Sequence, residues 1–341
     1  MKNIIFVTHA EKGPSGGAKY IYKFSQIING INNFSSEVLH IKKKKISKYK
    51  NSINKIFKIE KNFSSGWQFN DITCPKNFRY SWFENKINLK KNFIFNDKKD
   101  FIILPEIFAH LADKMLIKKN INYAILVQNG YSINSTNDET SLNKAYKNAK
   151  FILSVSNDTS NCIKIRFPKL KTKILKVSYS INLGIINFKR KKNIITYMSR
   201  KLPQHSNLVL QYLKSNLTKK WKIKNLQNLS EKKTHKILKK SKIFLSFSSL
   251  EGFGLPPLEA ALAGNSVIGY TGEGGTEYWK KPIFNKINSG EINNFVLKIF
   301  EVIKKIESKK ENSQLKYNFL MKKYSGENEI RNIKNFLKII K

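Results

Sequence analysis

Residues 243–279 read IFLSFSSLEGFGLPPLEAALAGNSVIGYTGEGGTEYW, and this stretch decides how the rest of the chain is interpreted. Its 37 residues contain no Lys and no Arg, although the chain carries 64 of them among 341 residues. At that average density about seven would fall here. The exclusion of these side chains indicates a segment that is buried or that surrounds a specific site.

The order of residues in this stretch predicts a strand, a glycine loop, a helix and a second strand. Ile243 to Phe247 is a short apolar run, typical of a strand buried on both faces. Pro256 and Pro257 suit the first turn of a helix, where the missing N–H has no partner anyway. Gly264 is placed to end that helix, and residues 266–270 form the next strand.

Two carboxylates flank the start of the predicted helix, with Glu251 in the loop and Glu259 in the first helical turn. Loop glycines let backbone N–H groups approach a ligand at the positive end of a helix dipole, which favours phosphate. A carboxylate would repel phosphate but accepts hydrogen bonds from hydroxyl groups. A sugar nucleotide carries both phosphate and vicinal hydroxyl groups, so it is the ligand that these features predict.

With seven residues between them, Glu251 and Glu259 form an E-x7-E pattern, and the stretch resembles the retaining GT-B glycosyltransferases of family 4 type. The resemblance implies that Glu259 holds the nucleotide ribose. It also implies that Glu251 and the loop residues face the donor sugar and its diphosphate; these loop residues are Gly252, Phe253, Gly254 and Leu255. The alternative is an ordinary buried βαβ unit whose glycines serve turns. The second glycine loop, residues 272–277, favours the functional interpretation.

Weaker signals lie in the amino-terminal half. Gly16 and Gly17 precede a run with helical spacing, and the loop resembles the amino-terminal glycine loop of the same family, which closes over the donor diphosphate. A plain strand-to-helix turn explains it equally well. Gln128 and Asn129 follow a predicted strand where many relatives carry a histidine near the donor sugar. Amides can bond a sugar hydroxyl, although such residues are also common turn formers.

Arg200 and Lys201 follow the predicted strand at residues 194–198, and relatives use a basic pair on this loop to neutralise the donor diphosphate. Arg200 matches the family arginine, and a guanidinium fork suits phosphate. The family lysine lies a few residues further on, where this chain has His205 and Ser206, so Lys201 is the substitute that we predict. A surface charge is the alternative. The chain has no D-x-D pair, so we expect no metal and no cofactor.

Composition sets the class of protein. The length of 341 residues and the 40% hydrophobic content suit two packed domains. The two cysteines are too few for a disulfide framework or a zinc cluster. The net charge of +41 is mostly scattered lysine with only five arginines, so we interpret it as solvated surface and do not expect nucleic acid as a partner. Without a spanning segment or a secretory signal, we expect a cytoplasmic protein; peripheral attachment to the inner face of the cytoplasmic membrane stays open.

Taken together, these patterns predict an α/β protein of the GT-B class: two Rossmann-like domains facing across a cleft, with a C-terminal helix crossing back to the first. We expect an acceptor-side domain at 1–185, a nucleotide-sugar domain at 186–310 and returning helices at 311–341. The expected partners are a nucleotide-sugar donor and a glycan, lipid-linked or small-molecule acceptor. The predicted reaction moves the sugar to an acceptor hydroxyl, with retention, for cell-surface glycan or polysaccharide synthesis. The alternatives are a phosphorylase, an epimerase, or a basic nucleic-acid or membrane-binding protein with a vestigial sugar site.

Overall fold

The computed structural model describes residues 1–11, 13, 15–44, 67–84, 86–184, 186, 190–308 and 315–340. Two compact units emerge from the contacts within the chain. The first comprises Met1–Val155, Thr159–Val177 and Ile330–Lys341, and the second comprises Ser156–Asp158 and Ser178–Glu329. The domain limits expected from the sequence stay predictions. The described residues do not include residue 185, at the first limit, or residues 311–314, after the second.

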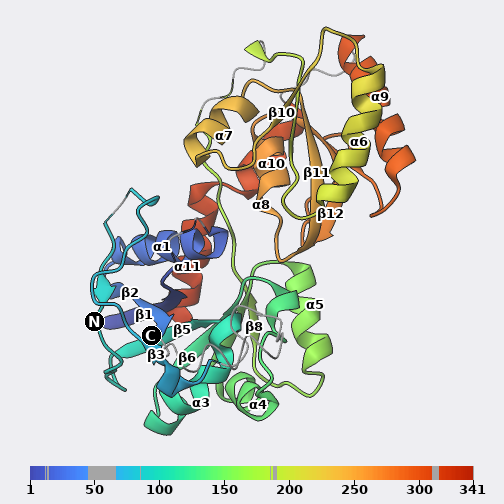
Figure 1. Ribbon diagram of the computed structural model, residues 1–341. Coiled ribbons are helices and arrows are strands. Elements are labelled where there is room, and N and C mark those ends of the chain that lie inside the picture. Colours follow the sequence, from blue (N-terminus) through green and yellow to red (C-terminus); the bar gives the residue numbers. More distant parts are fainter. Residues whose placement is uncertain are drawn as a thin grey trace. The chain divides into compact units, whose positions relative to one another are not determined.

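The first unit is built on a sheet of eight strands in the order β3-β2-β1-β5-β6-β7-β8, with β4 also paired to β2 (Figure 1). All pairings are parallel apart from the short β2–β3 pair. The strands are β1 Lys2–His9, β2 Phe34–Lys43, β3 Ile72–Thr73, β4 Leu89–Lys90, β5 Asp100–Pro105, β6 Tyr123–Val127, β7 Phe151–Ser154 and β8 Ile174–Lys176. The helices are α1 Gly16–Asn29, α3 Ala112–Met115, α4 Glu139–Asn148 and α5 Asn157–Arg166.

Burial explains why these strands form. Every residue of β5 and of β6 is buried, as expected for central strands covered on both faces of a parallel sheet. Between β5 and β6 the chain forms a 3₁₀ segment, Glu106–Leu111, followed by the single turn of α3 and a second 3₁₀ turn, Ile117–Lys119. Most residues of Glu106–Met115 are buried, so the path of this segment follows packing on several sides and not one amphipathic face.

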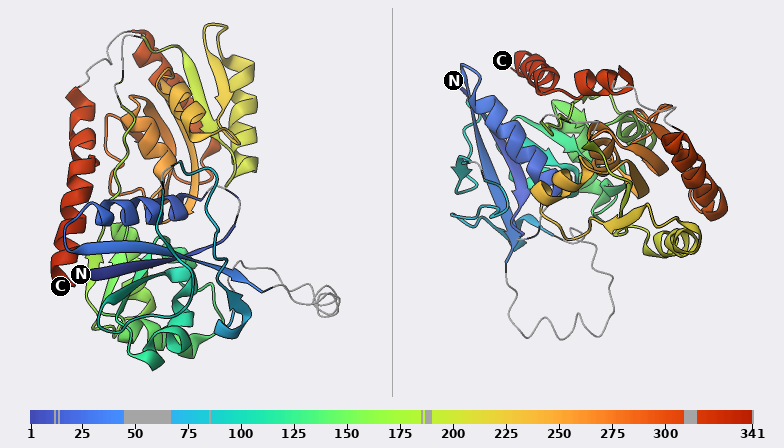
Figure 2. Two further views of the ribbon diagram at one scale, coloured as in Figure 1. Left: turned by 90° about the vertical axis from the view of Figure 1, so that its left-hand side faces the viewer. Right: turned by 90° about the horizontal axis from the view of Figure 1, so that it is seen from above.

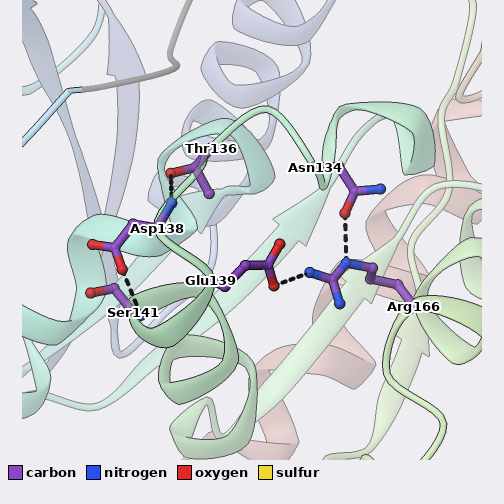
Figure 3. Close-up of polar contacts among 6 residues, drawn as sticks. All are labelled: Asn134, Thr136, Asp138, Glu139, Ser141 and Arg166. Carbon is purple, nitrogen blue, oxygen red and sulfur yellow. Dashed lines mark hydrogen bonds and ion pairs between the residues drawn. The ribbon is translucent and has the colours of Figure 1, made fainter.

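Arg166, one of the five arginines, has a structural role at the start of α4 (Figure 3). Its Nε donates to Asn134 Oδ1 at 2.6 Å, and its guanidinium forms an ion pair with Glu139. Asp138 caps the same helix by accepting the N–H of Ser141 at 3.0 Å, and that bond is the main cause of its lowered pKa. Arg166 is therefore occupied by neighbouring side chains.

The second unit is built on five parallel strands in the order β10-β9-β11-β12-β13 (Figure 1). The strands are β9 Ile194–Met198, β10 Lys222–Asn225, β11 Ile243–Glu251, β12 Ser266–Glu273 and β13 Phe284–Lys286. The helices are α6 Pro203–Asn216, α7 Glu231–Leu238, α8 Leu255–Leu262, α9 Ile292–Glu307, α10 Leu315–Lys323 and α11 Gly326–Ile339. Alternation of strand and helix, predicted from the sequence, gives a Rossmann-like sheet here and in the first unit.

Helices α6 and α9 lie side by side against the second sheet (Figure 1). The apolar stripe of α9 is buried in the same core as β11 and β12; its members are Phe295, Ile299, Val302 and Ile303. The amphipathic pattern of α9 therefore reflects packing on the helix's own sheet. None of the helices in the described part of the chain is both long and apolar enough to cross a membrane.

The last helix, α11, begins in the second unit and continues into the first from Ile330 onward. Phe336 packs against Phe24 of α1 and Phe101 of β5, with ring centroids 6.2 and 6.4 Å apart, and Figure 2 shows α11 beside α1. Ser325 caps the helix by accepting the N–H of Asn328 at 3.2 Å. The predicted α/β class with two parallel sheets and a returning C-terminal helix is confirmed.

Candidate donor-sugar site

The strand β11 extends further than the sequence predicted, and Glu251 is its last residue. The pairing with β12 shifts between Ser248 and Glu251, and Leu250 takes a left-handed conformation with φ 48°. This irregularity turns the chain out of the sheet at the carboxyl end of the strand. Ligands of parallel α/β sheets bind at that edge.

The loop after β11 is held by a tyrosine that the sequence did not single out. Gly254 has φ 76°, and a Cβ placed there would lie 2.9 Å from Tyr278 Oη. Tyr278 is buried, and its hydroxyl donates to the Gly254 carbonyl. Burial is the main reason that the pKa of Tyr278 is raised well above its usual value. The backbone before α8 is therefore fixed by a neutral hydroxyl.

The second glycine loop packs directly on the first. Gly274 N donates to Glu251 O at 3.0 Å, and a Cβ on Gly274 would lie 2.2 Å from Gly252 O. Only glycine permits that approach of one backbone to another. The two glycine segments, 252–254 and 272–275, thus form one interlocked structure.

Glu251 and Lys201, both predicted as site residues, are brought together. Lys201 Nζ lies 3.1 Å from Glu251 Oε1 and donates to Ser249 O at 3.0 Å. Their side chains are 30% and 26% exposed, so the ion pair is within reach of a ligand from solvent. Arg200 is exposed on the same loop. In a solvated position such a pair contributes little to stability, about 1 kcal/mol or less.

Glu259 lies one turn into α8, because the helix already begins at Leu255, and not in the first turn as predicted. Its side chain is 16% exposed and its Oε1 lies 3.6 Å from His235 Nε2 of α7. The sequence analysis missed His235. Its position among only five histidines of the chain was the available signal, but only the packing of α7 on α8 connects it to Glu259.

Phe253 is held by its ring and not by its backbone. Its side chain is 5% exposed and packs against the rings of Tyr179, Tyr278 and Tyr324, with centroids 4.9 to 5.9 Å apart. The ring therefore anchors the loop, which leaves backbone groups as the part of Phe253 available to a ligand. Leu255, the other apolar loop residue, is half-buried.

In the first unit the structure brings Gly17 and Gln128 together. Gln128 Nε2 donates to Gly17 O at 3.0 Å, and a Cβ on Gly17 would lie 2.7 Å from Gln128 Oε1. Gly16 begins α1, whose N-cap is Ser15, with Ser15 Oγ accepting the N–H of Ala18 at 3.3 Å. The amide of Gln128 thus supports the predicted glycine loop.

Glu106 is the buried carboxylate that shapes this strand end, and it too was missed. It accepts the backbone N–H groups of Gln128 and Asn129, each at 3.0 Å. Burial raises its pKa to about 7, against the opposing effect of these hydrogen bonds. Asn129 Oδ1 in turn accepts the N–H of Tyr131 at 3.1 Å. In the sequence, only the glutamate directly after Pro105 at a strand end hinted at this role.

Within the described residues, no three or more His, Cys, Asp or Glu side chains are grouped so that they could hold a metal ion. The polar groups described above in the second unit are the carboxylates of Glu251 and Glu259, the ammonium of Lys201, the loop amides and the imidazole of His235.

Residues 203–318 match the family model "Glycosyl transferases group 1". The match spans about a third of the chain, from α6 to α9, and includes both glutamates. No curated protein sequence matches the chain.

Solved structures with the same fold align with nearly the whole chain. A TarM variant from S. aureus in complex with fondaparinux, α-GlcNAc-glycerol and UDP aligns at TM-score 0.61 and 12% identity, covering 98% of this chain and 99% of that one. Anabaena HepE in complex with UDP and glucose aligns at 0.63 and 10%, covering 99% and 100%. The lipopolysaccharide outer core galactosyltransferase WaaB aligns at 0.59 and 12%, covering 99% and 100%. At these identities the likeness shows the fold.

Proposed function

We propose that this chain is a glycosyltransferase that moves a sugar from a nucleoside diphosphate sugar to an acceptor hydroxyl, using the edge of the second sheet where β11, the glycine loops and α8 meet. The observation that carries the proposal is the placement of Glu251, paired to Lys201, at the end of β11, with Glu259 one turn into α8. Two acceptors for hydroxyl groups and one cation surround a stretch of glycine backbone.

Each carboxylate has a distinct role in this proposal. Glu259 is 16% exposed and accepts the hydroxyls of the ribose. Glu251, beside Lys201, faces the donor sugar, and the N–H groups of Gly252, Phe253, Gly254 and Leu255 approach the diphosphate. An ionised carboxylate accepts up to four hydrogen bonds, so each can hold two hydroxyls.

Positive charge assists the departure of the diphosphate, which gains negative charge as the glycosidic bond breaks. Lys201 is partly exposed, so its ammonium can exchange Glu251 for a phosphate oxygen once a donor is bound. Arg200 adds a guanidinium from the same loop. Preorganised charges placed where charge develops in the transition state lower the barrier. On the family resemblance we also propose Gly16, Gly17, Gln128 and Asn129 of the first unit as donor-binding residues.

The finer assignments of the reaction follow from the family resemblance and from the neighbours. We propose retention of the anomeric configuration, stabilisation of the leaving group without a metal, and an acceptor in cell-surface glycan or polysaccharide synthesis at the cytoplasmic side. WaaB acts on the lipopolysaccharide outer core, which supports such an acceptor. UDP in the HepE and TarM structures makes UDP-sugars the first donors to test.

Two alanine substitutions test the assignment of the carboxylates. Glu259→Ala should abolish the thermal protection that UDP gives, because the ribose loses its acceptor. Glu251→Ala should keep most of the protection and lose most of the transfer rate. The measurement is thermal unfolding with and without UDP, together with turnover. Ligand at about a hundred times its Kd adds about 2.7 kcal/mol to the wild type.

A matched control is Glu301→Ala on α9, where the glutamate pairs with Lys298 and Lys305 on the surface. This variant should keep both protection and turnover. Full UDP protection in the Glu259→Ala variant would remove Glu259 as the ribose ligand. Equal loss of protection in both site variants would show that the two glutamates do not divide the roles in this way.

A further inference from the structure

His235 lies on α7 with its imidazole between two carboxylates. His235 Nε2 is 3.6 Å from Glu259 Oε1 of α8 and 3.9 Å from Glu231 Oε1 on its own helix. The side chain is 17% exposed, and Nε2 itself is buried with no hydrogen-bond partner in the described part of the chain. Both separations exceed the 2.7–3.2 Å of an N–H···O hydrogen bond. A buried nitrogen without a partner calls for an explanation.

The local sequence explains why the imidazole points at α8. Ser230 caps α7, and Glu231 and His235 are four residues apart, so they share one face of the helix. Asn265, fully buried, joins the ends of the two helices: its Nδ2 donates to Leu238 O and Ala260 O, each at 2.9 Å. Its Oδ1 accepts Ser241 Oγ–H at 2.8 Å. This network fixes α7 against α8 and keeps His235 beside Glu259.

We propose that His235 is a positioning residue for donor binding, which donates Nε2–H to Glu259 and holds that carboxylate toward the ribose hydroxyls. The inference rests on the proposed role of Glu259. A shift of either side chain by a few tenths of an ångström brings His235 Nε2 and Glu259 Oε1 within hydrogen-bonding distance. One carboxylate oxygen is then occupied by the imidazole, and the other is directed to the ligand. Without the imidazole, the carboxylate has more freedom to lose on binding.

Glu231 of α7 also lies near the imidazole, so two carboxylates compete for the same Nε2. Glu259 is the nearer, at 3.6 Å against 3.9 Å, and its side chain is 16% exposed against 52% for Glu231. Removing the Glu231 carboxylate should therefore leave the contact between His235 and Glu259 in place.

The experiment measures the Kd of UDP by isothermal titration for the wild type, His235→Leu and His235→Gln at one pH. Where GDP, ADP or dTDP binds the wild type more tightly, that nucleotide is the probe. His235→Leu should raise Kd about tenfold, because Glu259 loses its hydrogen-bond donor. His235→Gln keeps an N–H donor, so its Kd should stay within about threefold of the wild-type value.

The matched control is Glu231→Gln, which removes the more exposed carboxylate, 52% exposed, and leaves Glu259 in place; its Kd should stay within about twofold. His235→Leu binding UDP with the wild-type Kd, or His235→Gln binding it as weakly as His235→Leu, would overturn the proposal. An effect of Glu231→Gln as large as that of His235→Leu would overturn it too. Glu259→Ala separates the two levels: if it binds UDP normally, the assignment of Glu259 fails, and His235 falls with it. If only Glu259→Ala loses binding, the role of His235 alone is wrong.

Discussion

Individual residues hold the donor loop through contacts that leave no room for substitution. Gly254 and Gly274 approach Tyr278 Oη and the Gly252 carbonyl more closely than a Cβ allows. Tyr278 is the residue on which this packing depends, because its hydroxyl donates to the Gly254 carbonyl and its ring packs on Phe253 and Phe284. The glycines of the sequence motif therefore serve the packing of the two loops on each other.

Removing the Tyr278 hydroxyl should leave the Gly254 carbonyl without its donor. Tyr278→Phe is expected to lower the free energy of unfolding by about 1–3 kcal/mol, the usual cost of a buried polar group left unpaired. Urea denaturation measures this directly. Tyr212→Phe on α6 is the matched control, since Tyr212 is 50% exposed, and its effect should lie within about 0.5 kcal/mol. Equal stability of the two variants would contradict the role of Tyr278.

At the scale of elements, strands and helices with a clear period were predicted, and elements defined by tertiary packing were not. The strands Ile194–Met198 and Tyr123–Val127 are found where their apolar runs indicated. Residues 67–99 gave no period, because their aromatic side chains pack singly around α1 and β2. Phe78, Tyr80 and Phe83 each contact His40 or Tyr22. Residues 46–66, whose fold the sequence pattern did not predict either, lie outside the described residues.

His40 of β2 lies in this aromatic cluster, and it should make the first unit sensitive to acid. It is 1% exposed, accepts or donates a 2.7 Å hydrogen bond with Tyr22 Oη, and burial lowers its pKa to about 4, with a smaller effect of His9. A lowered pKa means that the unfolded chain binds the proton first. The stabilising contribution is present above pH 6.5 and is lost as the pH falls toward 4.

The test is the free energy of unfolding of the wild type and of His40→Gln between pH 4 and 7.5. The wild type should lose up to about 3 kcal/mol more than the variant over this range. The glutamine keeps a polar group near Tyr22 but does not titrate, so the slopes matter more than the absolute values. Parallel pH profiles would show that His40 is protonated equally in the folded and unfolded chain.

At the scale of the whole molecule, the sequence predicted the two parallel sheets and the returning C-terminal helix. It did not predict the contact of Lys201 with Glu251, nor the roles of His235, Tyr278 and Glu106, because each depends on packing between residues distant in sequence. The net charge of +41 comes from lysines scattered along the sequence, and the matches to solved structures assign these lysines no function. No local motif of the sequence identifies the acceptor or the glycosidic linkage either.

The central claim is that this chain breaks the glycosidic bond of a nucleoside diphosphate sugar at the β11–α8 edge. The most direct measurement incubates the wild type and Glu251→Ala with UDP-, GDP-, ADP- and dTDP-sugars and quantifies released nucleoside diphosphate by ion-exchange chromatography. We predict slow release from one donor class by the wild type, reduced at least tenfold in the variant. Release that is equal in the two proteins, or absent with every donor while DNA is retained at high salt, would contradict the account.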